Sequence, residues 1–224
     1  MTASTTAQDD QGRTNMNLQK RECPISFRFV PYGWGWEDVY LTVDGKTELF
    51  VVTGTHVPGS VDELFSAVAG LHPRYCNSGH LFNVYVDIDD NGNPVETKFW
   101  WDGEGVESEW TFSRPPTAEV DVPIEVKITE KDDGADSGDS ACFTVGYKDL
   151  CYAVAKGMTE TMKKHGLFAY GNAVWNHDLN LRLLLMLKAF ALDAEDVLKV
   201  EDLGRGNGER TDFAKELELI LFDM

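Results

Sequence analysis

The segment DIDDNGN (Asp87–Asn93) has the spacing of the first half of a calcium-binding loop. An EF-hand loop takes oxygen ligands from alternate residues, turns at a glycine and ends in a bidentate glutamate. Lys98 stands where that glutamate belongs, and a cation there opposes ion binding. The flanking segments LFNVYV and TKFWW alternate like strands, whereas an EF-hand requires helices. The sequence therefore predicts a hairpin turn, since Asp, Asn and Gly are common turn formers.

His72, Cys76 and His80 follow one another at intervals of four residues, and all three side chains are types that bind zinc. On a helix this spacing would place them on one face. Pro73 and the run Asn77-Ser78-Gly79 disfavour a helix here, and no fourth ligand lies nearby. The segment is therefore predicted to be a loop between a helix and a strand. Neither a metal nor a cofactor is expected.

Three glutamates lie close to three tryptophans in the middle of the chain: Glu104, Glu107, Glu109, Trp100, Trp101 and Trp110. Paired carboxylates beside aromatic rings are typical of a sugar-cleaving cleft. On a strand, however, Glu107 and Glu109 share one face, which is most simply the solvent-exposed side. The sequence also lacks the G-x-S-x-G, G-x-x-x-x-G-K-[ST] and G-x-G-x-x-G motifs. No catalytic residue is therefore assigned.

An enzyme is the alternative interpretation, because a site assembled from distant residues leaves no local motif. The candidates for such a hydrolase-like site are His56, His72 or His80 together with Glu104 or Glu107. A deep pocket in which a histidine and a carboxylate converge would support this interpretation.

The hydrophobic pattern predicts the elements that would position these residues. Residues 1–22 are polar and lack periodicity, which predicts a disordered leader before a single domain over residues 23–224. Alternating apolar residues predict strands on both sides of Asp44-Gly45, a common hairpin turn. Ser60 and Glu63 form a capping box for one inserted helix. Further strands follow, and the segment EKDDGADSGDS between them is predicted to be an acidic loop.

The last third of the chain has helical periodicity. One apolar stripe ends at His165-Gly166, and Leu179–Leu192 is apolar almost all round, which predicts a buried helix. Thr211 is predicted to cap a short terminal helix. The order of elements indicates an α+β fold with a mainly antiparallel sheet of about seven to eight strands. We expect one inserted helix, with the C-terminal helices packed on one face of the sheet.

Trp34 and Trp36 are interleaved with glycines at the start of a predicted strand. Glycines allow a close approach of the backbone, so the pair fits packing in the core or at a sheet corner. Tryptophan is also a common anchor of binding surfaces. The sequence leaves both interpretations open.

The composition is acidic, with 20 Lys+Arg against 38 Asp+Glu and a formal net charge of -18. Between His80 and Ser140 there are 16 acidic and 4 basic residues. Such a field repels nucleic acids and anionic membranes and favours a basic protein partner. The sequence shows no secretory signal and no apolar run long enough to span a membrane, so a cytoplasmic protein is expected.

Strand alternation predicts where these acidic side chains lie. Apolar residues such as Val84 and Ile124 should face the core, which sends their neighbours to the solvent face of the sheet. A slip of one residue in the register would turn a strand's set inward. The carboxylates predicted to form an acidic partner-binding face are Asp87, Glu96, Glu107, Glu109, Asp121 and Glu125.

The segments GWGWEDVYLTVDGK, SVDELFSAVAGL and KDLCYAVAKGMTETMKKHG occur in an order that resembles a group of uncharacterised bacterial α+β proteins. The resemblance covers roughly residues 24–192 and carries no catalytic residues. Acidic, motif-free chains of this size are also similar to immunity proteins that neutralise bacterial toxins. This resemblance implies a non-enzymatic binding protein, and the localised acidity predicts a basic toxin as its partner.

Overall fold

The computed structural model describes residues 16, 18–33, 36–45, 47–54, 60–76, 81, 83–102, 106–132, 135–167, 169–170, 179–202 and 209–224. The strands are β1 (Ile25–Gly33), β2 (Trp36–Val43), β3 (Thr47–Gly54), β4 (Tyr85–Ile88), β5 (Pro94–Asp102), β6 (Val106–Ser113), β7 (Pro123–Asp132), β8 (Ala135–Gly146), β9 (Glu201–Asp202) and β10 (Glu209–Arg210). The helices are α1 (Ser60–Gly70), α2 (Tyr147–His165), α4 (Leu181–Ala191), α5 (Phe213–Leu221) and the 3₁₀ helix η1 (Glu195–Leu198).

Two antiparallel sheets carry most of the strands. One has three strands in the order β1-β2-β3, and the other has five in the order β4-β5-β6-β7-β8. The rings of Phe27 and Trp110, one from each sheet, lie 6.4 Å apart in the shared core. The predicted α+β class with antiparallel strands is confirmed, although the strands are divided between two sheets.

Two turns form for the local reasons that the sequence indicated. Asp44 and Gly45 have φ angles of 55° and 63°, as a type I′ turn between β2 and β3 requires. The Asp89 carboxylate accepts hydrogen bonds from the backbone N–H groups of Asn91 at 2.9 Å and Asn93 at 2.8 Å. β4 and β5 pair as antiparallel neighbours across this turn. The prediction of a hairpin turn is confirmed.

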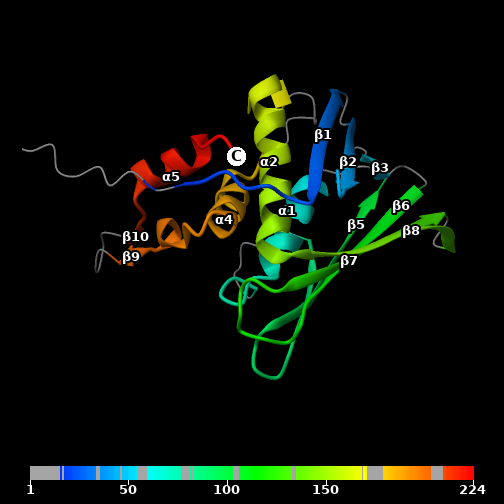
Figure 1. Cartoon of the computed structure of the whole chain (residues 1–224), viewed down its shortest axis with the longest axis horizontal. Helices are drawn as coiled ribbons and strands as arrows, with labels where there is room; N and C mark the ends of the chain where they lie inside the picture. The colour runs from blue at the N-terminus through cyan, green and yellow to red at the C-terminus, as the bar shows by residue number, and fades with distance from the viewer. Residues whose placement is uncertain are drawn as a thin grey trace, which may run out of the picture.

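Helix α2 lies against β1 at the edge of the smaller sheet (Figure 1). A Cβ atom on Gly157 would come within 2.3 Å of the Phe27 carbonyl oxygen, so only glycine permits this approach. One turn later, the Thr161 hydroxyl donates a hydrogen bond to the Phe29 carbonyl at 2.8 Å. The helix thus satisfies part of a strand edge that would otherwise be open to pairing.

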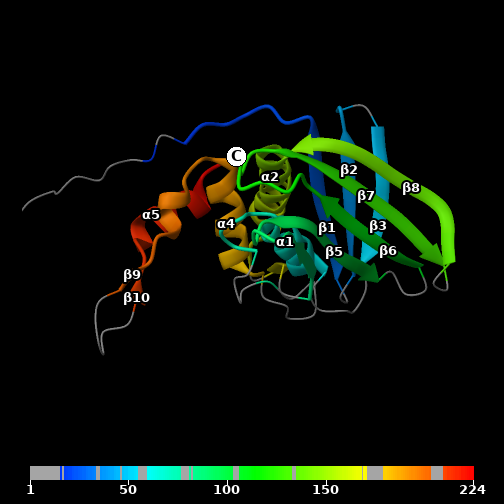
Figure 2. The ribbon, with the colours of Figure 1, turned by 90° about the horizontal axis from the view of Figure 1, so that it is seen from below.

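Helix α1 packs on the inner face of β5, where the Thr97 hydroxyl donates to the Ala67 carbonyl at 2.9 Å. Helices α4 and α5 lie on the far side of α2 from the sheets (Figures 1 and 2). Every residue from Leu183 to Ala191 is buried, which confirms the prediction of a buried helix. Buried Lys188 donates from Nζ to the carbonyls of Ile220 at 2.7 Å and Phe222 at 2.9 Å, and so ties α4 to the end of α5.

Two local predictions are wrong. The segment EKDDGADSGDS is not a loop, because β7 extends to Asp132 and β8 begins at Ala135. An outer strand with only one neighbour tolerates such polar residues. The cap of α5 is Asp212 and not Thr211, since the Asp212 carboxylate accepts from the N–H groups of Ala214 and Lys215.

The described residues before β1 contact α2 and the C-terminal part of the chain. The Met16 N–H donates to Glu218 at 3.0 Å, and Lys20 and Arg21 form ion pairs with Asp223 and Asp149. Residues 1–15 of the predicted leader lie outside the described residues, as do Trp34 and the side chain of Trp36. Within the described residues, no helix is long and apolar enough to cross a membrane.

Candidate binding face

The outer face of the five-stranded sheet is built by strand alternation. In β5, Thr97, Phe99 and Trp101 point into the core and are buried. Glu96 and Trp100 alternate with them and therefore point to the opposite, solvent side. The antiparallel register of the neighbouring strands continues this pattern. We call this surface the outer sheet face; its charged and aromatic side chains are Tyr85, Asp87, Glu96, Lys98, Trp100, Glu107, Glu109, Glu125, Lys127 and Lys131.

Most of the predicted carboxylates meet on the outer sheet face. Asp87 lies directly opposite Glu96, and Ser113 separates Glu96 from Glu125 in the same cross-strand row. Like charges placed directly opposite each other repel. The row is therefore an arrangement that folding alone does not favour. The predicted strand register is confirmed for Asp87, Glu96, Glu107, Glu109 and Glu125.

Asp121 does not belong to the outer sheet face. It lies in the connection before β7, which begins at Pro123. The Asp121 carboxylate accepts from the backbone N–H of Lys148 at 3.4 Å, at the start of α2. A negative charge there interacts favourably with the helix dipole. The predicted placement of Asp121 on the sheet is wrong, because the strand starts only after it.

Glu109 is the centre of a polar network on this face. Its Oε2 accepts from Lys131 Nζ at 2.8 Å and from Trp100 Nε1 at 3.2 Å. Lys98 Nζ lies 3.7 Å from its Oε1. The Lys131 hydrogen bond, followed by the charge of Lys98, holds the pKa of Glu109 below its ordinary value. The network fixes the orientation of the Trp100 indole while its ring stays accessible to a partner.

Two aromatic rings stand out of the outer sheet face. Tyr85 is 56% exposed and Trp100 is 42% exposed. Tyr85 lies opposite Lys98, which makes it a diagonal neighbour of Trp100 across β4 and β5. Tyrosine and tryptophan are enriched at the centres of protein interfaces. The sequence analysis missed this pair, although the same alternation that predicts the carboxylates also turns these rings outward.

The charge of the outer sheet face is mixed, because lysines lie among the carboxylates that were predicted to form an acidic face. Lys98, Lys127 and Lys131 lie among the carboxylates, and two of them are engaged by Glu109. Of the described residues, none forms an ion pair with Asp87, Glu107 or Glu125. These three carboxylates lie around the network of Glu109, although Lys131 stands opposite Glu107 across β6 and β7 while it binds Glu109.

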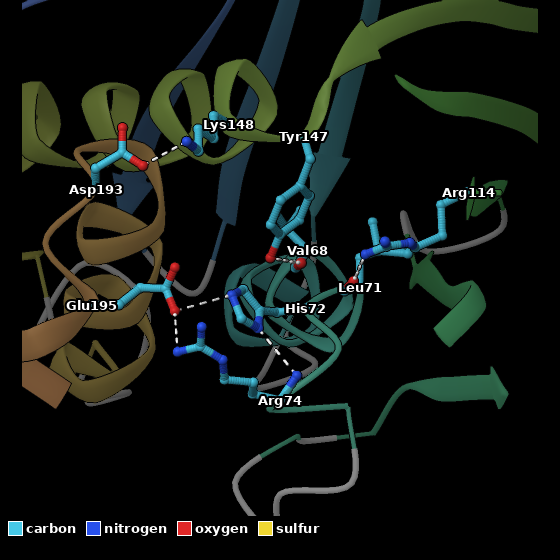
Figure 3. Close-up of polar contacts among 9 residues, drawn as sticks. All are labelled: Val68, Leu71, His72, Arg74, Arg114, Tyr147, Lys148, Asp193 and Glu195. Atoms are coloured by element: carbon cyan, nitrogen blue, oxygen red, sulfur yellow. Dashed lines mark hydrogen bonds and ion pairs between the residues drawn. The ribbon is translucent and has the colours of Figure 1, made fainter. Parts of the chain in front are cut away.

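His72 belongs to the alternative, enzymatic interpretation, and it is fully buried where the end of α1 meets α4 (Figure 3). Its ring stacks on Phe190 with the centroids 4.3 Å apart. Its Nδ1 accepts from the backbone N–H of Arg74 at 3.2 Å. Its Nε2 lies 3.4 Å from Oε2 of Glu195. The imidazole is thus enclosed by packed rings and short polar contacts.

The protonation of His72 follows from this enclosure. Burial lowers the pKa of His72 to about 3, and the cations of Arg74 and Arg114 act in the same direction. Glu195 favours a charged ring, but its Oε2 is shared with Arg74, whose Nη1 lies 3.0 Å away. His72 is therefore a neutral, packed core residue at physiological pH.

The partners proposed for His72 do not join it. Glu107 is exposed on the outer sheet face, whereas His72 follows α1 on the helical side of the same sheet. The sheet separates the two side chains, so they do not form one site. His56, His80 and Glu104 lie outside the described residues. Within the described part of the chain, no group of three His, Cys, Asp or Glu residues could hold a metal ion.

Two adjacent acids on β2, Glu37 and Asp38, are buried, which the sequence analysis missed, and Glu37 is the one with a strongly raised pKa. Oε2 of Glu37 on β2 accepts from the Tyr170 hydroxyl at 3.1 Å, while its Oε1 is buried without a hydrogen-bond partner. Burial is the largest cause that raises the pKa of Glu37 to about 8. Strand alternation was the available signal, because Glu37 has the same parity as buried Val39 and Leu41.

No protein-family model, curated protein or solved structure matches this chain.

Proposed function

We propose that this chain is a non-catalytic, cytoplasmic binding protein that uses the outer sheet face to capture a basic protein. The observation that carries the proposal is the arrangement of this face. Exposed Tyr85 and Trp100 share this face with Asp87, Glu107 and Glu125, which form no ion pair with a described residue. The aromatic rings supply contact area, and the carboxylates supply electrostatic attraction.

The aromatic and the charged side chains are expected to contribute to binding in different ways. Buried aromatic anchors at the centre of an interface provide most of the affinity. Charges around them mainly steer the encounter, raise the association rate and select the partner. Trp100 is held by Glu109 before the partner arrives, so less conformational entropy is lost when its indole enters the interface.

A toxin-neutralising role is the biological context that we propose for this face. The resemblance to immunity proteins motivates it, and so does the net charge of -18. A toxic enzyme that acts on nucleic acid carries a basic surface, to which an acidic protein is complementary. The expected partner is a basic protein encoded next to this gene.

Co-expression tests the proposal. A basic neighbouring protein should be toxic alone, harmless when expressed with the wild-type chain, and co-eluted with it as one complex. Trp100→Ala should weaken that complex by about tenfold or more, because it removes a central aromatic anchor. Leu167→Ala is the matched control, because it truncates a side chain that is 48% exposed away from the outer sheet face.

Two results would contradict the proposed function. In one, the neighbouring basic protein does not bind at low salt. In the other, the complex forms with equal affinity for the wild type and Trp100→Ala, so that the partner uses another surface.

A further inference from the structure

The terminal helix α5 exposes a stripe of large apolar side chains. Phe213, Leu217 and Leu221 follow one another at intervals of four residues and therefore share one face of the helix. They are 71%, 44% and 70% exposed, respectively. Leu219, on the opposite face, is buried in the cluster formed with α4. The helix thus has two apolar faces, of which only one packs against described parts of the chain.

A groove begins at the first residue of this stripe. It has a volume of about 540 Å³ and passes between η1, the β9–β10 hairpin and the start of α5. Phe213 forms its apolar wall, and Asp196, Glu201 and Asp212 contribute carboxylates to its lining. Lys199, Arg210 and Lys215 also line the groove, so it is a polar pocket of mixed charge next to the apolar stripe.

The charges along the stripe are unequally compensated. At about 100° per residue, Glu216 and Glu218 lie on its two borders. Glu216 accepts from the Thr211 hydroxyl, and Glu218 accepts from the Met16 N–H at 3.0 Å, so both hydrogen-bond partners are neutral. Of the three cations that line the groove, Arg210 lies 2.9 Å from Glu201 and Lys215 lies 3.7 Å from Asp196, whereas Lys199 forms no ion pair with a described residue and lies toward the groove end of the stripe. The borders therefore carry a surplus of negative charge.

We propose that this stripe binds an amphipathic helix of a partner protein, whose apolar residues are flanked by lysines and arginines. A helix laid along a groove buries anchors at the spacing of helical turns, which matches the spacing of Phe213, Leu217 and Leu221. Basic flanks on the partner would meet Glu216 and Glu218 on the two borders of the stripe. The occupant is thus defined by both its shape and its charge.

Two other occupants fit the stripe less well. In a second copy of this chain, the acidic borders of one α5 would meet those of the other. The chain's own residues 1–15 contain no Leu, Ile, Val or Phe, so they offer no apolar stripe of their own.

This surface is distinct from the outer sheet face. α5 and strands β6 to β8 lie at opposite ends of the molecule in both views (Figures 1 and 2). A protein bound to the sheet would leave α5 accessible to a second segment. The inference therefore does not depend on the proposed function.

A synthetic peptide provides the probe. It carries leucines spaced three and four residues apart with lysines at the flanking positions, and its comparison peptide carries glutamates in place of the lysines. Binding of the fluorescently labelled peptides to the full-length protein is measured by anisotropy. The double variant Phe213→Ser/Leu221→Ser should weaken binding of the lysine peptide about tenfold or more. Glu216→Gln/Glu218→Gln should weaken it less and reduce its dependence on salt.

Controls separate this surface from loss of folding and from the outer sheet face. Circular dichroism should show the same helix content and the same unfolding midpoint for the serine variant, because both substituted side chains are largely exposed. Trp100→Ala should bind the lysine peptide like the wild type.

Three results would overturn the inference: equal binding of the glutamate peptide, no effect of the serine variant, or a wild-type dimer in sedimentation velocity that the serine variant abolishes. The last result would identify a second copy of the chain as the occupant.

Discussion

The buried surroundings of Glu37 make the stability of the folded protein depend on pH. Burial raises its pKa to about 8 from an ordinary value of 4.5. The native state therefore holds a proton that the unfolded chain releases once the pH passes that ordinary value. The stabilisation from this group is complete below the ordinary pKa and is lost as the pH rises through about 8.

Glu37→Gln should remove this dependence. The amide is neutral at all pH values and can still accept from the Tyr170 hydroxyl. At about pH 8 the variant should unfold with a free energy higher than that of the wild type by on the order of 1–3 kcal/mol, with little difference at about pH 5. Urea denaturation at the two pH values measures the difference in the free energy of unfolding at each of them. Glu160→Gln, an exposed change on α2, is the control. A variant that loses stability at the higher pH would mean that the Glu37 carboxylate is charged and stabilising in the fold.

Residue-level predictions from the sequence succeeded where the chemistry is local. Asp44, Asp89 and their neighbouring glycines form turns because their side chains and φ angles act within a few residues. The sequence could not foresee that His72 packs against Phe190 and Glu195, because those partners lie more than a hundred residues away along the chain. Whether a residue such as His72 belongs to a functional site depends on tertiary contacts, which local sequence patterns do not reveal.

At the level of elements, the two predicted features that failed did so for physical reasons. The acidic segment EKDDGADSGDS looked like a loop by composition, yet it forms the end of β7 and the start of β8, which pair at positions such as Lys131 with Asp136 and Thr129 with Ser140. An outer strand can carry polar residues on both faces, so composition does not separate it from a loop. At α5 the helix begins one residue later than expected, because Asp212 competes successfully with Thr211 for the capping position.

Gly157 allows a close contact between elements that can be tested directly. A methyl group at this position would meet the Phe27 carbonyl oxygen at 2.3 Å, and a backbone atom in a paired strand cannot move away cheaply. Gly157→Ala should therefore destabilise the protein by about 1–3 kcal/mol. Alanine is a better helix former than glycine by about 1 kcal/mol. The expected loss of stability is what remains after this gain.

Thermal and urea unfolding measure the effect of Gly157→Ala. Lys156→Ala is the matched control, because it changes the neighbouring helical position, whose side chain is only half-buried, and should alter stability little. Should Gly157→Ala be as stable as the wild type, α2 would not approach β1 as closely as described.

For the molecule as a whole, the fold separates two kinds of surface. The outer sheet face lies at one end and the apolar stripe of α5 at the other, with α2 between them (Figure 1). The sequence predicted the fold class from the order of its elements, and it predicted the outward direction of five carboxylates from strand alternation. The lysine network around Glu109 and the position of Asp121 depend on strand register and strand ends, which the sequence pattern leaves open.

The central claim is that the location of the acidic residues matters, and not only their number. Asp87→Asn/Glu107→Gln/Glu125→Gln removes three charges from the outer sheet face. Glu22→Gln/Glu119→Gln/Glu160→Gln removes three exposed charges elsewhere, so the two variants have the same net charge. The variant on the outer sheet face should fold at least as well as the wild type, because neutralising Asp87 relieves its repulsion with Glu96.

The most direct test is the association rate of the basic partner identified by co-expression, measured by stopped flow at low and high salt. The account predicts that the variant on the outer sheet face associates about tenfold more slowly than the wild type at low salt. It also predicts that the control variant stays close to the wild type and that the difference shrinks at high salt. Equal association rates for the two variants would contradict the account, since the acidity would then act only through the total charge of the protein.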